Sequence, residues 1–268
     1  MEKFVKKYIA EHGAPKSDDL DAVLADVYKK FEETEFSELG GKTPVSFYES
    51  GVDNYGLLLK RYFDEGLGAN DYLIDAAVKC GKDEDFLFLL DETLDEDVVI
   101  AAIDILDKKN SKLPFDRYVD LLFNEKTDPC IVDKIAEVLY VNADDVADAI
   151  LSRLDGVAMP DSVFAEILSG CSVRRDGVKK LLLSGLKTGD RVAEYCSYLV
   201  RYGDESVVKE LEAFRDCVDD YVSFKELDLA IEALGGVSDR SRDFEEDLDY
   251  IKIKEAEKAV NDVGEDKN

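Results

Sequence analysis

Apolar residues recur along this chain at every third or fourth position, the spacing of one face of an α-helix. The strict alternation of apolar and polar residues that marks a half-buried β-strand is nearly absent. The clearest helical faces are Val98, Ala101, Ala102, Ile105 and Leu106; Ile131, Ile135, Val138 and Leu139; and Val146, Ala149, Ile150 and Leu154. The pattern predicts an all-α protein.

Turn-forming residues, mostly glycine, asparagine and proline, interrupt these faces at regular intervals. The helices between them fall into pairs. The first helix of each pair is expected to begin near Asp53, Asp83, Phe115, Ala143, Arg174 and Asp204, and the second near Ala69, Asp95, Asp128, Pro160, Gly189 and Asp219. Successive first helices are then 28 to 32 residues apart. One such hairpin cannot bury its apolar face alone, so this period predicts hairpins that stack on their neighbours.

The two ends of the chain depart from this period. Residues 1–50 are expected to form N-terminal capping helices, with helices at 2–11 and 18–36 and a short turn from Pro44. The repeat array then covers residues 51–236. A final amphipathic helix over 242–260 is expected to cap the last repeat within residues 237–263, and residues 264–268 are expected to be a disordered tail.

The second helices carry a short motif. Residues 95–106 and 128–139 both begin with aspartate, followed by apolar residues at positions four, five, eight and twelve. This resembles the Asp-x-x-Val-Arg-x-x-Ala-x-x-x-Leu pattern of HEAT repeats. Val99 and Val132 stand where that family usually has arginine, so we expect the Asp–Arg ladder between HEAT repeats to be missing. The resemblance implies an α-α superhelix, a right-handed solenoid of about six HEAT-like helical hairpins, and a general habit of binding macromolecules.

The net charge of −28 bears on the choice of partner. Such a surface repels phosphate backbones and anionic lipid, so nucleic-acid and membrane partners are disfavoured, and self-repulsion favours a monomer over a dimer. Acidic doublets and triplets fall where helices begin, so we expect aspartates to cap helix N-termini. No apolar run approaches the length of a membrane span, and the N-terminus lacks the features of a secretory signal. These two features predict a cytoplasmic protein.

Few residues suit metal or redox chemistry. The five cysteines include no Cys-x-x-Cys pair, and His12 is the single histidine. We expect the cysteines to behave as small apolar residues, and we predict no metal site and no cofactor. The sequence offers no Ser-His-Asp set, no His-Glu-x-x-His motif and no phosphate-binding loop, so no catalytic residue is assigned and an enzyme is not expected.

One repeat reverses the sign of the charge. Residues 172–201 contain seven bases and three acids, whereas the flanking segments are strongly acidic. Within this repeat Arg191, Tyr195, Tyr198 and Tyr202 share one helical face, and Arg174 and Arg175 precede it. Tyrosine and arginine are frequent at binding hot spots, which makes these six residues the candidate partner-binding site. The alternative is that the tyrosines pack between adjacent repeats.

These features favour a non-enzymatic scaffold that holds a protein or peptide on a curved helical-repeat surface. A second hypothesis is an acidic decoy or shield for a basic partner, which rests on net charge. A third is an enzyme of the HEAT-like DNA-repair type or of the bilin-lyase type. The acidic composition argues against a DNA-binding groove, and no residue indicates a bilin lyase specifically.

Overall fold

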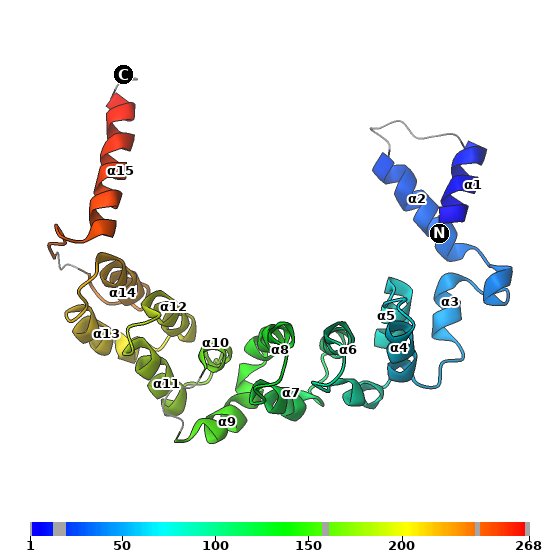
Figure 1. Ribbon diagram of the computed structural model, residues 1–268, viewed down its shortest axis with the longest axis horizontal. Coiled ribbons are helices and arrows are strands. Elements are labelled where there is room, and N and C mark those ends of the chain that lie inside the picture. Colours follow the sequence, from blue (N-terminus) through cyan, green and yellow to red (C-terminus); the bar gives the residue numbers. More distant parts are fainter. Residues whose placement is uncertain (1, 13–19, 157–160, 239–241, 266–268) are drawn as a thin grey trace. The chain divides into compact units, whose positions relative to one another are not determined.

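The computed structural model describes residues 2–12, 20–156, 161–238 and 242–265 (Figure 1). These ranges contain α-helices, short 3₁₀ helices and one isolated β-bridge between Phe36 and Lys42, but no β-strand. The prediction of an all-α protein is therefore confirmed. Nowhere in the described ranges is a helix both long and apolar enough to cross a membrane. The chain divides into two compact units, Met1–Val132 (unit 1) and Asp133–Asn268 (unit 2), which we describe separately.

Unit 1 begins with three helices that precede the paired helices. Its elements in order are α1 (Glu2–His12), α2 (Leu20–Glu33), η2 (Ser37–Leu39), α3 (Pro44–Glu49), α4 (Tyr55–Asp64), α5 (Asp71–Cys80), η3 (Asp83–Asp85), η4 (Leu87–Leu89), α6 (Glu96–Lys108), α7 (Phe115–Leu122) and the start of α8 (Pro129–Val141). Helix α5 packs against α3, α4 and α6. Its buried residues Leu73, Ala76 and Ala77 therefore lie in the core of this unit.

Unit 2 contains the rest of α8 and three further hairpins. Its elements are α9 (Ala143–Leu154), α10 (Ser162–Ser169), α11 (Asp176–Leu186), α12 (Val192–Tyr202), η5 (Glu205–Val207), α13 (Val208–Arg215), α14 (Tyr221–Ala233) and α15 (Leu248–Glu265). The second helices α10, α12 and α14 pack side by side in chain order (Figure 1). Each first helix packs on the second helix of its own hairpin, as α11 does on α12.

Most of the predicted helix starts agree with the structure to within three residues. Pro160 lies outside the described residues, and the helix expected there, α10, begins at Ser162. The expected capping also occurs. An aspartate carboxylate accepts a backbone N–H bond at the start of several helices: Asp95 at α6, Asp128 at α8, Asp161 at α10, Asp204 at η5 and Asp220 at α14. Each bond satisfies an amide that a helix leaves unpaired in its first turn.

Two segments differ from the predicted helices. The helix expected from Asp83 consists instead of the 3₁₀ turns η3 and η4, and both turns pack against α4. The Asp85 carbonyl approaches Gly56 so closely that a Cβ on Gly56 would lie 1.8 Å from its oxygen. The helix expected from Arg242 begins instead at Leu248, where the Asp247 carboxylate caps α15. Helix α15 continues to Glu265, and residues 266–268 of the expected tail lie outside the described residues.

A buried ion pair joins the two helices of the last hairpin. The Arg215 guanidinium of α13 donates to the Asp228 carboxylate of α14 at 2.8 Å, and both side chains are buried. The Arg215 guanidinium also lies 5.8 Å from the centre of the Phe224 ring. A buried charge is tolerated when it is paired in this way, so the contact fixes how α13 meets α14.

Candidate functional site

The six residues predicted as a partner-binding site lie together around the α11–α12 hairpin of unit 2. Arg174 and Arg175 immediately precede α11, and Arg191 immediately precedes α12. The three tyrosines are on α12 itself. The structure therefore brings the predicted residues into one hairpin, and the exposure of each side chain decides what it is able to bind.

The three tyrosine rings are buried. Tyr195, Tyr198 and Tyr202 expose 8%, 9% and 1% of their surface, and Tyr195 meets Tyr198 edge to face at 5.6 Å. Tyr195 also lies over Gly185 of α11, where an added Cβ would come within 2.1 Å of the ring. Helix α12 is in contact with α10, α11 and α14, so more than one of its faces is covered. The burial agrees with the alternative that the tyrosines pack between adjacent repeats, and these rings offer little contact area to a partner.

Tyr202, the last residue of α12, bonds to the backbone just before α11. Its hydroxyl accepts from the backbone N–H of Arg175 at 2.6 Å and donates to the Arg175 carbonyl at 3.2 Å. The Arg174 guanidinium lies 4.7 Å from the centre of the Tyr202 ring and donates to the Gly203 carbonyl at 3.0 Å. Arg174 and Tyr202 therefore hold the two ends of this hairpin together.

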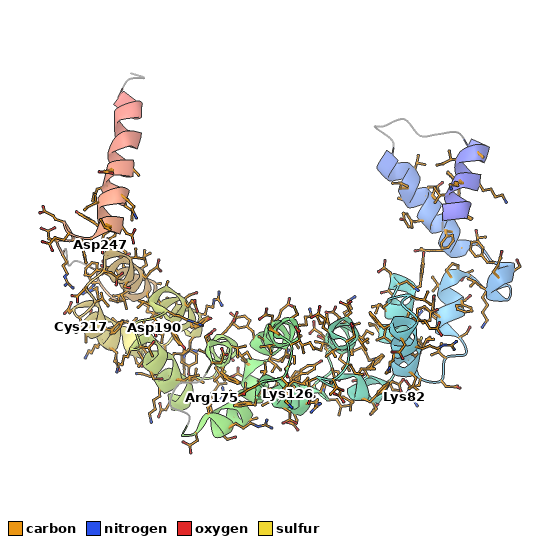
Figure 2. All side chains as sticks on the ribbon, viewed as in Figure 1. Lys82, Lys126, Arg175, Asp190, Cys217 and Asp247 are labelled. Carbon is orange, nitrogen blue, oxygen red and sulfur yellow. The ribbon has the colours of Figure 1, made fainter. Side chains whose placement is uncertain are left out.

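Arg175, whose side chain is labelled in Figure 2, connects α11 to the preceding hairpin. Its guanidinium donates to the Asp144 carboxylate of α9 at 2.5 Å. The same carboxylate accepts from the backbone N–H groups of Ser172 and Val173 at 3.0 and 3.2 Å, and from the Ser172 hydroxyl. The bonds from Ser172 and Arg175 hold the pKa of Asp144 well below its usual range. We call Asp144 and the three residues that donate to it, Ser172, Val173 and Arg175, the Asp144 junction.

Three of the other five bases of this repeat also make contacts. Lys179 donates to the Ser206 hydroxyl at 2.8 Å, and Arg191 donates to the Ser162 hydroxyl at 2.6 Å. The Arg201 guanidinium lies 5.9 Å from the ring centres of both Tyr140 and Tyr198. Much of the local excess of positive charge therefore serves contacts between neighbouring elements. For Lys179 and Arg191, the sequence signal that would have found the contacts is the separation of 27 and 29 residues between the partners.

Charged contacts between hairpins also occur in unit 1. Val99 is fully buried in α6, so no arginine is accommodated at that position of the motif. Other residues make the contacts instead. Lys109 donates to the Gly81 carbonyl at 3.0 Å, and Arg117 donates to the Leu90 carbonyl at 2.7 Å and to Glu92 at 3.1 Å. These contacts come from positions other than position five of the sequence motif.

Three surface hollows are lined by carboxylates. In unit 1, a hollow of about 510 Å³ between α4 and α6 has three acids and one lysine, and a second of about 480 Å³ between α2 and α5 also has three acids and one lysine. We call the second hollow the α2–α5 pocket. In unit 2, a hollow of about 710 Å³ around Phe244 is lined by six acids and no base. All three hollows would favour a positively charged ligand over a negative one.

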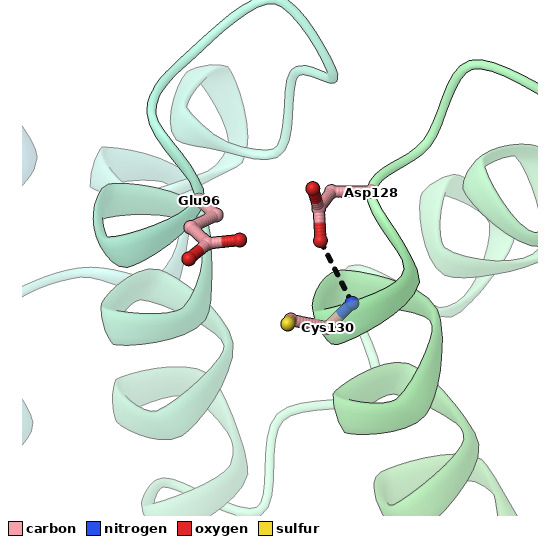
Figure 3. Close-up of side chains that lie close together, drawn as sticks. All are labelled: Glu96, Asp128 and Cys130. Carbon is pink, nitrogen blue, oxygen red and sulfur yellow. Dashed lines mark hydrogen bonds between the residues drawn. The ribbon is translucent and has the colours of Figure 1, made fainter.

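A separate cluster contains two carboxylates and a thiol (Figure 3). The possible ligand atoms of Glu96, Asp128 and Cys130 lie within 4.8 Å of one another, and all three residues are exposed. Asp128 accepts from the Cys130 backbone N–H at 2.8 Å. The Asp128 charge raises the pKa of Glu96, and the Glu96 charge raises the pKa of the Cys130 thiol. Exposed groups of this kind are common at helix N-termini, and we assign no metal ion to them.

The cysteines differ partly from their expected role as apolar residues. Cys171 and Cys196 are buried, whereas Cys80, Cys130 and Cys217 are exposed. The exposed three lie at or just beyond the ends of helices, at the last residue of α5, in the first turn of α8 and after α13. The buried face of a helix is interrupted at such positions, so helical periodicity overestimates burial there.

In comparisons of the chain with known proteins, no family model, no curated protein and no solved structure matches it.

Proposed function

We propose that this protein is a helical-repeat scaffold that binds basic segments of a partner protein on its acidic surface. The observation that carries the proposal is the lining of the three hollows, where carboxylates far outnumber lysines. The basic repeat offers a partner less free surface, because its tyrosines are buried and most of its cations contact neighbouring elements.

A HEAT-like solenoid arrangement of the hairpins within each unit is part of this proposal. Its support is the separation in sequence of the residues that join neighbouring hairpins. Five such contacts have separations of 27 to 31 residues: Arg117 to Leu90, Lys109 to Gly81, Arg175 to Asp144, Lys179 to Ser206 and Arg191 to Ser162. A nearly constant separation is expected when each repeat contacts only the next one.

The electrostatics of such a scaffold favour a basic partner in two ways. The net charge of −28 attracts cations at long range and raises the rate of encounter. Carboxylates held on the walls of a hollow then bind a cation at a fixed place, which a uniformly charged surface does not do. The proposed scaffold therefore both attracts a basic partner and holds it at a defined position.

The test is binding of a fluorescent peptide in which arginines alternate with glycine and serine. Fluorescence anisotropy is recorded with the folded protein and with the same chain unfolded in urea, which has the same net charge. We expect saturable binding to the folded chain at about 0.15 M salt, weakening as salt rises, and much weaker binding to the unfolded chain. Equal binding to both forms, or no saturation at low salt, would refute the proposal.

A further inference from the structure

The α2–α5 pocket is lined by three aromatic rings, whereas each of the other two hollows has one. Tyr28 and Phe31 come from α2, and Tyr72 comes from α5. The ring centres of Phe31 and Tyr72 are 6.3 Å apart, and the rings are tilted by 42°. Tyr28 exposes 52% of its surface, which is high for a ring of its size. The volume of about 480 Å³ falls within the roughly 300–1,000 Å³ range of small-ligand pockets.

Three carboxylates stand beside these rings. Glu32 lies one helical turn after Tyr28 on α2, and Asp71 and Asp75 are one turn apart on α5. Within the described part of the chain, no hydrogen bond or ion pair engages the three carboxylates. Burial, together with the charges of Glu32 and Asp71, raises the pKa of the Tyr72 hydroxyl. The pocket therefore combines aromatic faces with a negative potential.

The position of Glu32 on α2 favours the binding of a cation in the pocket. It lies in the last turn of α2, where the helix dipole disfavours a negative charge. Asp75 repels Asp71 at the i,i+4 spacing. Lys108, the last residue of α6, also lines the pocket and offsets part of this charge, but three acids remain against one base. A second cation in the pocket would relieve both unfavourable interactions.

We infer that the α2–α5 pocket binds an arginine side chain of a basic protein segment, with the guanidinium against the aromatic rings and hydrogen-bonded to the carboxylates. Guanidinium stacks on aromatic faces and donates to carboxylates in a planar fork. A quaternary ammonium would use the rings but has no N–H for the acids. The inference rests on the proposed function and names the ligand group and the place of binding.

The test uses the full-length protein and the arginine peptide introduced above, with matched lysine and glutamine peptides. Glu32→Gln/Asp75→Asn should weaken binding of the arginine peptide roughly ten-fold. Tyr28→Leu, which keeps an apolar side chain but removes the ring, should weaken it roughly three- to ten-fold. Lys108→Gln should strengthen binding, a change that damage to the fold would not produce. The matched control is Asp133→Asn/Asp190→Asn, which removes two exposed charges from unit 2.

The outcomes separate this inference from the proposed function. Preference for arginine over lysine, lost in the pocket variants and kept in the control, supports the pocket. Equal weakening by the pocket and control variants would overturn the pocket and leave diffuse binding to the acidic surface. No binding of any basic peptide to the unaltered protein would overturn both. Circular dichroism at neutral pH verifies that each variant has the helix content of the unaltered protein.

Discussion

Replacement of Asp144 tests the contact that joins two successive hairpins of unit 2. In the structure its carboxylate accepts from the Ser172 and Val173 amides, the Ser172 hydroxyl and the Arg175 guanidinium. These partners lie 28 to 31 residues further along the chain. The substitution Asp144→Asn preserves the size of the side chain but removes its charge and one of its acceptor oxygens.

The expected loss of stability follows from the exposure of the junction. Hydrogen bonds to a charged group contribute about 1.5–3 kcal/mol each when protected from water. The Asp144 side chain is 33% exposed, so hydrogen bonds to water replace some of the hydrogen bonds that the substitution removes. We therefore expect the variant to be less stable by about 2 kcal/mol in total at neutral pH, which corresponds to a melting temperature lower by roughly 4–8 °C.

The same junction predicts a dependence on pH. The pKa of Asp144 is lower in the folded protein than in the unfolded chain, where it is about 3.9. The contribution of Asp144 to the free energy of unfolding is complete above the unfolded pKa and is lost as the pH falls through the folded pKa. The unaltered protein should thus lose more stability between neutral pH and about pH 3 than the Asp144→Asn variant does.

Urea unfolding, followed by far-ultraviolet circular dichroism at both pH values, measures these differences. The control is Asp148→Asn, one turn further along α9. Asp148 lies 3.4 Å from Arg175 Nε, but its side chain is 91% exposed, so the expected cost is below about 0.5 kcal/mol. Equal stability of the two variants would refute the reasoning, because the junction would then contribute no more than a surface charge.

Two further predictions concern packing and thiol chemistry. Gly185→Ala places a Cβ against the Tyr195 ring and should destabilise the protein by about 1–3 kcal/mol, measured by urea unfolding. If that contact is the cause, adding Tyr195→Ala should give less than the sum of the two single effects, and additivity would contradict it. Glu96→Gln should lower the pKa of Cys130 and speed its alkylation at mildly alkaline pH, because the thiolate is the reactive form. The rate is measured by mass spectrometry against Cys217, and a change shared by both thiols would argue against a local effect of Glu96.

The helices of this protein could be predicted from the sequence because their signals are local. Apolar spacing fixes which residues form each helix, and an aspartate such as Asp95 or Asp220 caps the helix that follows it. The period of about thirty residues could be read in the same way, since turns recur at that interval. Neither signal requires knowledge of which helices meet.

The exposure of the candidate residues was decided by the tertiary structure. Periodicity placed Tyr195, Tyr198 and Tyr202 on one face of α12, but it could not show that neighbouring helices cover that face. The partners of Arg175 and of the pocket residue Tyr72 are likewise distant in sequence, on other helices. A single helix specifies where its side chains point, whereas burial and charge pairing depend on what other segments of the chain, often about thirty residues away, place against them.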